Sequence, residues 1–252
     1  MVRKTTFLVL IILLVAFTLP LVFKKSVPFG SGEGARAVPA QTLVPKKLQR
    51  IGEKIVYDVR LRSLFLGRAT FEHLPQAELN SRQVNVMTFT TKLVRFSDVE
   101  RISSDPESNL PIRVERIIST WPVPEKITEE YDSERFSVAI TKIKGRRQEK
   151  ISLKQDAPIH NAILLPFYVR DIPELRVGWH MDATLPAQKY EIRLVAIEDV
   201  TVPAGTFKAY RFESVPKKFE IWVSVDERRI PLKIKGIGNL GYNLAMKKYS
   251  LR

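Results

Sequence analysis

The stretch FEIWVSVDERRIPLKI (residues 219–234) alternates apolar and polar side chains on both sides of a short charged run. This alternation has the period of a β-strand with one buried face and one face in solvent. The charged run DERR (226–229) interrupts it and predicts a turn between two antiparallel strands. The apolar positions are Phe219, Ile221, Val223, Ile230, Leu232 and Ile234.

The same two-residue period recurs along most of the chain after residue 52. It is clearest at residues 54–60, 84–89, 136–141 and 189–196. The sequence Val202-Pro203-Ala204-Gly205 has the composition of a tight turn between two strands. Short intervals between turns leave no room for helical crossovers, so neighbouring strands should be antiparallel. We therefore predict a mainly β fold, either a single antiparallel curved sheet or a partly open barrel.

One segment departs from this period. Asp156 is a suitable N-cap, and the apolar residues after it recur at helical spacing. Pro166 must break or kink such a helix. We predict a helix at residues 157–165, followed by a second short turn toward Arg170. In a domain of strands, one short helix normally caps an open end of the sheet.

The N-terminus holds the longest apolar run. Residues 5–23 are uncharged, and nineteen helical residues span roughly 28 Å, close to a bilayer's hydrocarbon core. A cleaved signal peptide is the alternative, but its apolar run is shorter, and two lysines stand where the cleavage site is expected. We predict a transmembrane signal-anchor at residues 1–25, a flexible linker at 26–45 and one antiparallel β domain at 46–252.

Six motifs stand out in the body of the chain. They are GEKIVYDV (52–59), LGRA (66–69), LPFYVR (165–170), VG (177–178), VPAGTF (202–207) and IWVSVDERRIPL (221–232). Together they resemble an exported bacterial family known as domain of unknown function 3108, over about residues 52–251.

This resemblance implies an envelope protein built of antiparallel strands. It implies no activity, because the family has no established catalytic residues. The family pattern at the helix lacks proline, so Pro166 leaves the length of the helix open. Many relatives look like cleaved exports, so the retained anchor rests on the residues of this chain alone.

Composition agrees with an exported location. Cys is absent, which excludes disulfides, a thiol nucleophile and a Cys-ligated metal site. The formal net charge is +14. In a cytosolic protein this surplus would indicate nucleic acid; behind an apolar anchor it indicates anionic lipid or an acidic envelope polymer, with solubility as the plainer explanation.

From these features we predict a single-pass protein of the bacterial inner membrane. Residues 5–23 would contact the bilayer, and the body would lie in the periplasm. Secretion to the periplasm after signal cleavage is the alternative. We predict no nucleic-acid partner, and the sequence does not identify a protein partner.

No motif indicates a metal or a cofactor. His73, His160 and His180 are far apart in the sequence and form no ligand pair. The sequence GIGNLG (236–241) matches the letters of a dinucleotide fingerprint. It precedes a predicted strand instead of a helix, so we interpret it as a hairpin bend.

The main functional hypothesis follows from the predicted sheet. A curved sheet has a concave apolar face, which forms a pocket if the helix does not fill it. We predict a non-catalytic envelope protein that binds a lipid or a lipid-linked glycan in this cavity. Each candidate for the pocket wall could instead belong to the packed core. The candidates are Tyr57, Phe71, Phe167, Tyr190, Phe212 and Trp222.

Two other functions stay open. The first is an envelope glycan hydrolase that uses Asp156, His160 and Asp226, with Asp156 and His160 on one helical face. Structural roles for these residues, as an N-cap, a helix-surface histidine and a charged hairpin tip, are favoured over catalysis. The second is a scaffold that docks a protein partner through an edge of the sheet.

Overall fold

The computed structural model describes residues 50–94, 96–119, 122–237 and 241–251. The predicted anchor at 5–23 and the predicted linker at 26–45 lie outside these ranges. No helix within them is long and apolar enough to cross a bilayer.

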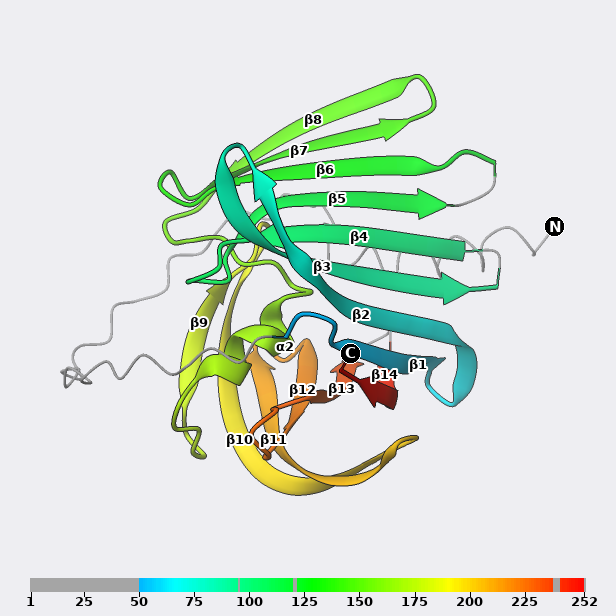
Figure 1. Cartoon of the computed structure of the whole chain (residues 1–252), viewed down its shortest axis with the longest axis vertical. Coiled ribbons are helices and arrows are strands. Elements are labelled where there is room, and N and C mark those ends of the chain that lie inside the picture. The colour runs from blue at the N-terminus through cyan, green and yellow to red at the C-terminus, as the bar shows by residue number, and fades with distance from the viewer. Residues whose placement is uncertain (1–49, 95, 120–121, 238–240, 252) are drawn as a thin grey trace. The chain divides into compact units, whose positions relative to one another are not determined.

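Fourteen strands form one antiparallel sheet in the described part of the chain (Figure 1). Strands β1 to β8 follow one another as neighbours, and so do β9 to β14. β1 (Lys54–Leu61) pairs with β14 (Tyr242–Ser250), so the first and last strands join the two runs. The others are β2 (Leu64–Leu79), β3 (Arg82–Leu93), β4 (Phe96–Ser104), β5 (Pro111–Ser119), β6 (Glu125–Asp132), β7 (Ser137–Lys144), β8 (Arg147–Lys154), β9 (His180–Thr184), β10 (Lys189–Val202), β11 (Gly205–Val215), β12 (Phe219–Ser224) and β13 (Pro231–Gly236). The prediction of a mainly β fold with a single antiparallel sheet is confirmed.

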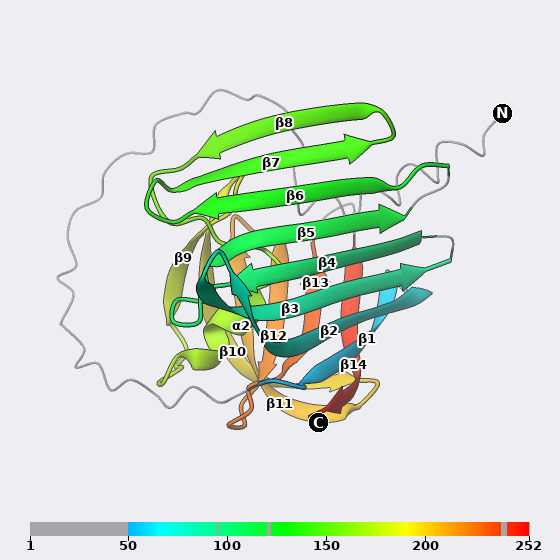
Figure 2. The same ribbon diagram turned by 45° about the horizontal axis from the view of Figure 1, so that its top comes forward.

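The two runs of strands lie over one another as two layers. Figure 2 shows β2 to β6 passing crosswise in front of β12 and β13. The outermost strands, β8 and β9, do not pair with each other, so the sheet stays open. The short helix α2 (Leu165–Tyr168) lies at the end of the layers where β10 runs.

Aromatic side chains on the inward faces connect the sheet to the helix. The ring of Phe71 on β2 stacks on Phe89 of β3, with 4.4 Å between the ring centroids. It also meets Tyr57 edge-on at 5.5 Å and Phe167 of the helix at 5.1 Å. Burying each of these rings stabilises the fold by roughly 1.5–3 kcal/mol. Phe167 therefore fastens the helix to the interior of the sheet.

The predicted helix at residues 157–165 is wrong in position. The structure instead forms the single turn α2 (Leu165–Tyr168) and the 3₁₀ turn η1 (Val169–Asp171). Pro166 occupies the first turn of α2, where its missing N–H has no intrahelical partner to lose. The proline thus begins the helix instead of ending it.

The residues before α2 bond to the sheet in place of forming a helix. The backbone N–H of His160 donates to the carbonyl of Thr184 on β9 at 2.7 Å, and Ile159 bridges to the same residue in parallel. The side chain of Asn161 accepts a hydrogen bond from the N–H of Ile163 at 2.8 Å. These bonds divert the donors that a helix would use, because each N–H serves one main acceptor.

Two predicted turns are confirmed. β10 ends at Val202 and β11 begins at Gly205, whose φ of 133° a side chain would disfavour. β13 ends at Gly236, and β14, antiparallel to it, begins at Tyr242. The sequence GIGNLG therefore connects two strands, as a hairpin bend does.

Candidate functional site

A buried ion pair holds the segment between the two runs of strands. Residues 157–171 are hereafter called the plug segment. Near its end, Arg170 donates two hydrogen bonds to the carboxylate of Glu53 at 2.6 and 2.7 Å. The two side chains are 1% and 2% exposed. Arg170 also donates to the carbonyl of Arg228 at 2.7 Å. This pairing fixes the plug segment to the start of β1.

The environment keeps Glu53 charged. Burial disfavours its carboxylate, but hydrogen bonds from Arg170 and His73 outweigh burial and lower the pKa of Glu53 to about 2. The Nδ1 atom of His73 lies 3.1 Å from the Glu53 carboxylate. Glu53 therefore acts as a buried anion at neutral pH and satisfies the guanidinium of Arg170.

A second tie holds the end of the plug segment. Arg50 donates to the Asp171 carboxylate at 2.6 Å, and Asn109 donates to it at 3.2 Å. Arg229 donates to the carbonyl of Pro173 at 3.0 Å. Side chains from three separate parts of the chain thus converge on Arg170, Asp171 and Pro173, at and just beyond the end of the plug segment.

A second group of buried charges lies on β4, β5 and β6. It consists of Asp98, Glu100, Arg116, Glu129 and Tyr131, hereafter the acid cluster. Arg116 donates to Asp98 at 2.9 and 2.5 Å and lies 3.3 Å from Glu100. Tyr131 donates to Glu129 at 2.5 Å. The cluster brings three carboxyl groups close to one guanidinium.

This imbalance of charge changes the protonation of the cluster. Burial raises the pKa of Glu100 to about 8; Arg116 opposes this effect, while Asp98 and Glu129 add to it. Burial also raises the pKa of Glu129. Glu100 is therefore mostly protonated at pH 7, and Asp98 supplies the charge that Arg116 needs.

The plug segment reaches this cluster. Tyr131 interacts with the side chain of Asn161, and the His160 ring meets the Tyr168 ring edge-on at 5.1 Å. The Tyr168 hydroxyl lies near the backbone of Asn161 without forming a hydrogen bond of good geometry. The His160 ring lies near the backbone of Thr184 and Pro158, but its buried Nδ1 forms no hydrogen bond of good geometry in the described part of the chain. Such orphaned groups are uncommon in protein interiors.

Four of the six candidate pocket residues share one environment. Tyr57, Phe71, Phe167 and Phe212 are buried on the inward side, and the Tyr57 hydroxyl donates to the carbonyl of Pro231 at 2.6 Å. The structure brings the first three into direct ring contact. Phe212 meets Trp179 instead, at 6.0 Å between ring centroids.

The remaining two candidates lie apart from this group. Tyr190 is half-buried, and its ring centroid lies 5.4 Å from that of Phe219. Trp222 alternates with the inward residues of β12 and so faces the other side of the sheet. Its indole N–H donates to Glu198 at 2.8 Å, and Lys233 lies 4.9 Å from its ring centroid.

The structure does not assemble the predicted hydrolase residues. The helical face expected to join Asp156 to His160 does not exist, because residues 157–164 are not helical. Asp156 is exposed and forms an ion pair with Lys189. Asp226 stabilises the turn after β12, where it accepts a hydrogen bond from Ser224 at 2.9 Å and others from backbone N–H groups. Each acid has a local structural partner.

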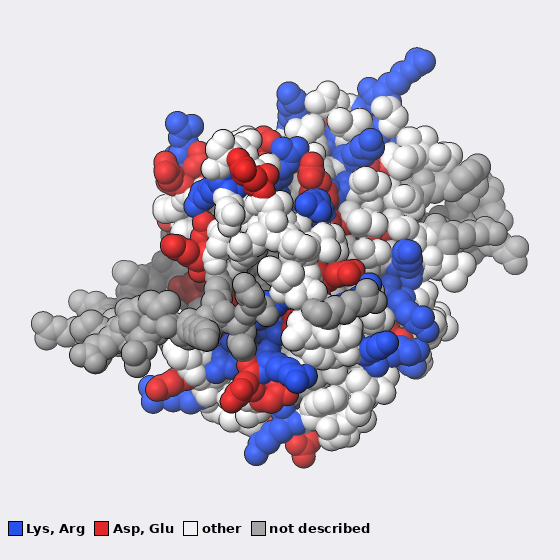
Figure 3. Space-filling model, in the orientation of Figure 1, with Lys and Arg blue, Asp and Glu red and all other residues white. Residues whose placement is uncertain are grey.

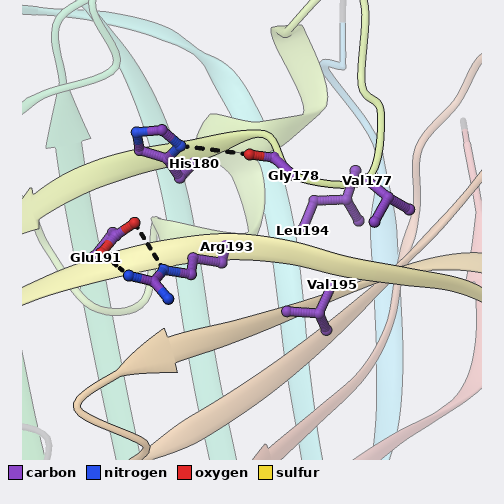
Figure 4. A pocket seen from close by; sticks show the side chains of 7 residues that line it. All are labelled: Val177, Gly178, His180, Glu191, Arg193, Leu194 and Val195. Carbon is purple, nitrogen blue, oxygen red and sulfur yellow. Dashed lines mark hydrogen bonds and ion pairs between the residues drawn. The ribbon is translucent and has the colours of Figure 1, made fainter. Parts of the chain in front are cut away.

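A shallow hollow opens at the start of β9, beside residues 191–195 of β10 (Figure 4). Its volume is about 490 Å³, and it is widely open to solvent. Glu191 and Arg193 pair with each other along β10 at 2.7 Å, and His180 contacts the carbonyl of Gly178 at 3.4 Å. Its charges are thus neutralised locally. The lining residues are Val177, Gly178, His180, Glu191, Arg193, Leu194 and Val195.

No group of three potential metal ligands converges within the described ranges. The sequence interpretation did not find the Glu53–Arg170 pair or the acid cluster. For the cluster a signal exists: Asp98 and Glu100 share the parity of Phe96 and Ile102, so charges occupy an inward face. No comparable signal joins Glu53 to Arg170, which are 117 positions apart.

Comparison with known proteins gives a family and a fold. The family model described as "Protein of unknown function (DUF3108)" matches residues 56–245. No curated protein matches the chain. The crystal structure of a β-barrel-like protein of domain of unknown function DUF1849 from Brucella abortus is similar, with a TM-score of 0.51 and 8% identity. The match covers 80% of this chain and 98% of that chain.

A second solved structure shares less of its geometry. It is a presumed exported protein with a YmcC-like fold from Bacteroides fragilis, with a TM-score of 0.29 and 8% identity. The match covers 79% of this chain and 96% of that chain.

Proposed function

This chain belongs to the DUF3108 family, whose function is unknown, and from that premise we propose that it is a non-catalytic protein of the bacterial envelope. It binds the acyl part of a lipid or lipid-linked glycan beneath its plug segment. Residues 5–23 hold it in the inner membrane, with its body in the periplasm. Secretion after signal cleavage is the alternative location.

The pairing of the buried charges supports a non-catalytic role. Glu53 is neutralised by Arg170 and Asp98 by Arg116, each pair being almost completely buried. A general acid or base must reach a substrate, either directly or through one water molecule. These carboxylates instead accept hydrogen bonds from neighbouring guanidinium groups.

The observation that carries the ligand proposal is the composition of the plug segment. Its apolar side chain Phe167 packs on Phe71 in the interior, while its polar atoms at Tyr168 and His160 lack good hydrogen bonds. An amphiphile, which has an apolar chain and a polar head, resembles this segment in having both an apolar part and a polar part. An acyl chain can replace the ring contacts, and a polar head can satisfy the two orphaned groups.

The ligand therefore competes with the plug. Tyr57, Phe71 and Phe212 become the wall of the site when Phe167 withdraws. The helical part of the plug is only seven residues long, from Leu165 to Asp171, and side-chain bonds supply much of what holds it. A plug held in this way has an open state whose population sets the apparent affinity.

Native mass spectrometry tests this proposal directly. The full chain is extracted from cell membranes in a mild detergent, and its mass is measured before and after organic extraction. We expect a co-purified amphiphile in near-equal amount to the protein. A protein that is free of lipid and does not take up a dansyl-labelled fatty acid would refute the ligand site.

A variant pair tests the role of the plug. Asp171→Asn weakens the tie to Arg50 and should raise affinity for the fatty-acid probe by about two- to fivefold, because it raises the population of the open state. Glu191→Gln is the control: the side chains of Glu191 and Asp171 are 27% and 26% exposed, and each pairs with an arginine. Equal affinities in both variants would show that the plug does not control binding.

A further inference from the structure

Four hairpin turns of the first run of strands lie at one end of the sheet. They are the turns β1–β2, β3–β4, β5–β6 and β7–β8, hereafter the turn end. Antiparallel neighbours reverse direction at each connection, so alternate turns must meet at the same end. Figures 1 and 2 show the strand ends that these connections join along one side of the layer.

Several large apolar side chains are exposed to solvent at the turn end. Leu64, Phe65 and Val94 lie at the tips of two adjacent turns and are 64%, 49% and 81% exposed. Val99 and Ile117 are direct cross-strand partners on the outer face nearby. With Ile143, these make six of the eleven large apolar side chains exposed in the described ranges. Concentration of this kind indicates an interaction surface.

Basic side chains surround this apolar patch. Eight Lys and Arg side chains lie on or beside the same turns, against the acids Glu125 and Glu149 in the same stretches. Figure 3 shows Lys and Arg gathered along this side of the molecule with few acids among them. The basic residues are Arg60, Arg62, Arg68, Lys92, Lys126, Lys144, Arg146 and Arg147.

We propose that the turn end is the surface by which the domain docks on an anionic phospholipid bilayer. This inference rests on the membrane location in the proposed function, and it adds which face meets the lipid. Leu64, Phe65 and Val94 would enter the headgroup layer, while the basic side chains bind lipid phosphates. No ligand beneath the plug segment is required.

Shape and charge favour a bilayer over a second copy of the chain. The apolar side chains project from turns instead of lining a groove, which suits a flat deformable surface. A symmetric contact between two copies would place a net six positive charges (eight basic less two acidic side chains) against six, and like charges across an interface are strongly unfavourable. An anionic surface neutralises them.

A single label reports docking, because the chain has no cysteine of its own. The full chain carrying Leu64→Cys is labelled with the fluorophore NBD and reconstituted into vesicles. One set contains phosphatidylcholine alone, and the other an equal mixture with phosphatidylglycerol. We expect quenching by doxyl lipids only in the anionic vesicles. Val177→Cys, an exposed apolar site beside β9, is the control and should stay unquenched in both.

A second experiment removes basic charges from the turn end. Arg68 and Lys92 are cross-strand partners next to the exposed tips, and both are exposed. Arg68→Gln combined with Lys92→Gln should lower the ratio of docked to undocked label about 25-fold, at about fivefold for each charge. The matched control, Lys154→Gln with Arg176→Gln, removes two exposed charges away from the turn end and should leave the ratio unchanged.

Three results would overturn the proposal. The first is equal solvent exposure of the label at position 64 in both vesicle types. The second is quenching of the label at position 177 in the anionic vesicles as strong as that of the label at position 64. The third is concentration-dependent shielding in detergent without vesicles, which would indicate contact between copies. A protein that carries no amphiphile would refute the ligand site but leave this result unchanged.

Discussion

Replacing Arg170 with Met removes the partner of a carboxylate that has almost no contact with water. The substitution deletes the two hydrogen bonds of 2.6 and 2.7 Å to Glu53 and leaves that side chain 2% exposed. An uncompensated buried charge costs about 3–5 kcal/mol in the free energy of unfolding. For a domain of this size, this corresponds to a fall of about 6–20 °C in the unfolding midpoint.

The pKa of Glu53 gives a second way to estimate this loss in the free energy of unfolding. It is lowered from 4.5 to about 2, and at about 1.36 kcal/mol for each pKa unit this equals roughly 3 kcal/mol of stability. A carboxyl whose pKa is lower in the folded state contributes fully above its unfolded pKa. That contribution is lost as the pH falls from about 4.5 toward 2. Arg170→Met should therefore flatten the acid limb of the stability curve as well as lower it.

The assay is thermal unfolding of the full chain in mild detergent, followed by circular dichroism at several pH values between neutral and acid. Arg193→Met serves as the control, because it removes an arginine from an exposed pair with Glu191. Exposed pairs of this kind contribute about 0–1 kcal/mol. If Arg170→Met and Arg193→Met gave the same midpoint at neutral pH, the energetic role assigned to the buried pair would be refuted.

Two further substitutions test other parts of the fold. Burial raises the pKa of Glu100 to about 8, so the folded state holds a proton that the unfolded state releases, and stability should fall as the pH rises from about 5 to 8. Glu100→Gln should remove this slope in urea unfolding; an unchanged slope would assign it to another group. At Gly67 an added Cβ would overlap the carbonyl of Lys92 on the neighbouring strand, so Gly67→Ala should destabilise the protein by about 1–3 kcal/mol. A thermal midpoint equal to that of the unsubstituted protein would show that the hairpin relaxes freely.

The strands were predictable because their signal is local. Alternation at residues 219–234 places Ile221 and Leu232 inward, and both are buried on neighbouring strands. The turn at Val202-Pro203-Ala204-Gly205 follows from residue chemistry over four positions. The pairing of β1 with β14 has no such signal, because it joins residues that are nearly two hundred positions apart.

The helix was misplaced because tertiary bonds outweighed local periodicity. The spacing of apolar residues from Ile159 to Phe167 fits a helix, but the N–H of His160 bonds to β9 instead. Once that bond forms, the helix can begin only near Pro166. The partner of Arg170 was beyond prediction for a related reason: nothing in the sequence around Arg170 indicates which distant acid it meets.

Fold and function separate clearly in this protein. The Brucella abortus structure shares the fold at 8% identity, so the sheet requires little more than alternation and turns. A sheet of this kind could hold apolar residues at positions 98, 100 and 116, and replacing buried ion pairs with apolar groups is often neutral or stabilising. Glu100 is mostly protonated at neutral pH, and holding that proton removes stability as the pH rises. The fold therefore does not account for the acid cluster, whose Tyr131 bonds to Glu129 and interacts with Asn161 of the plug segment. Since departures from local design rules concentrate at functional sites, the plug and the cluster beneath it are the place where functional experiments should begin.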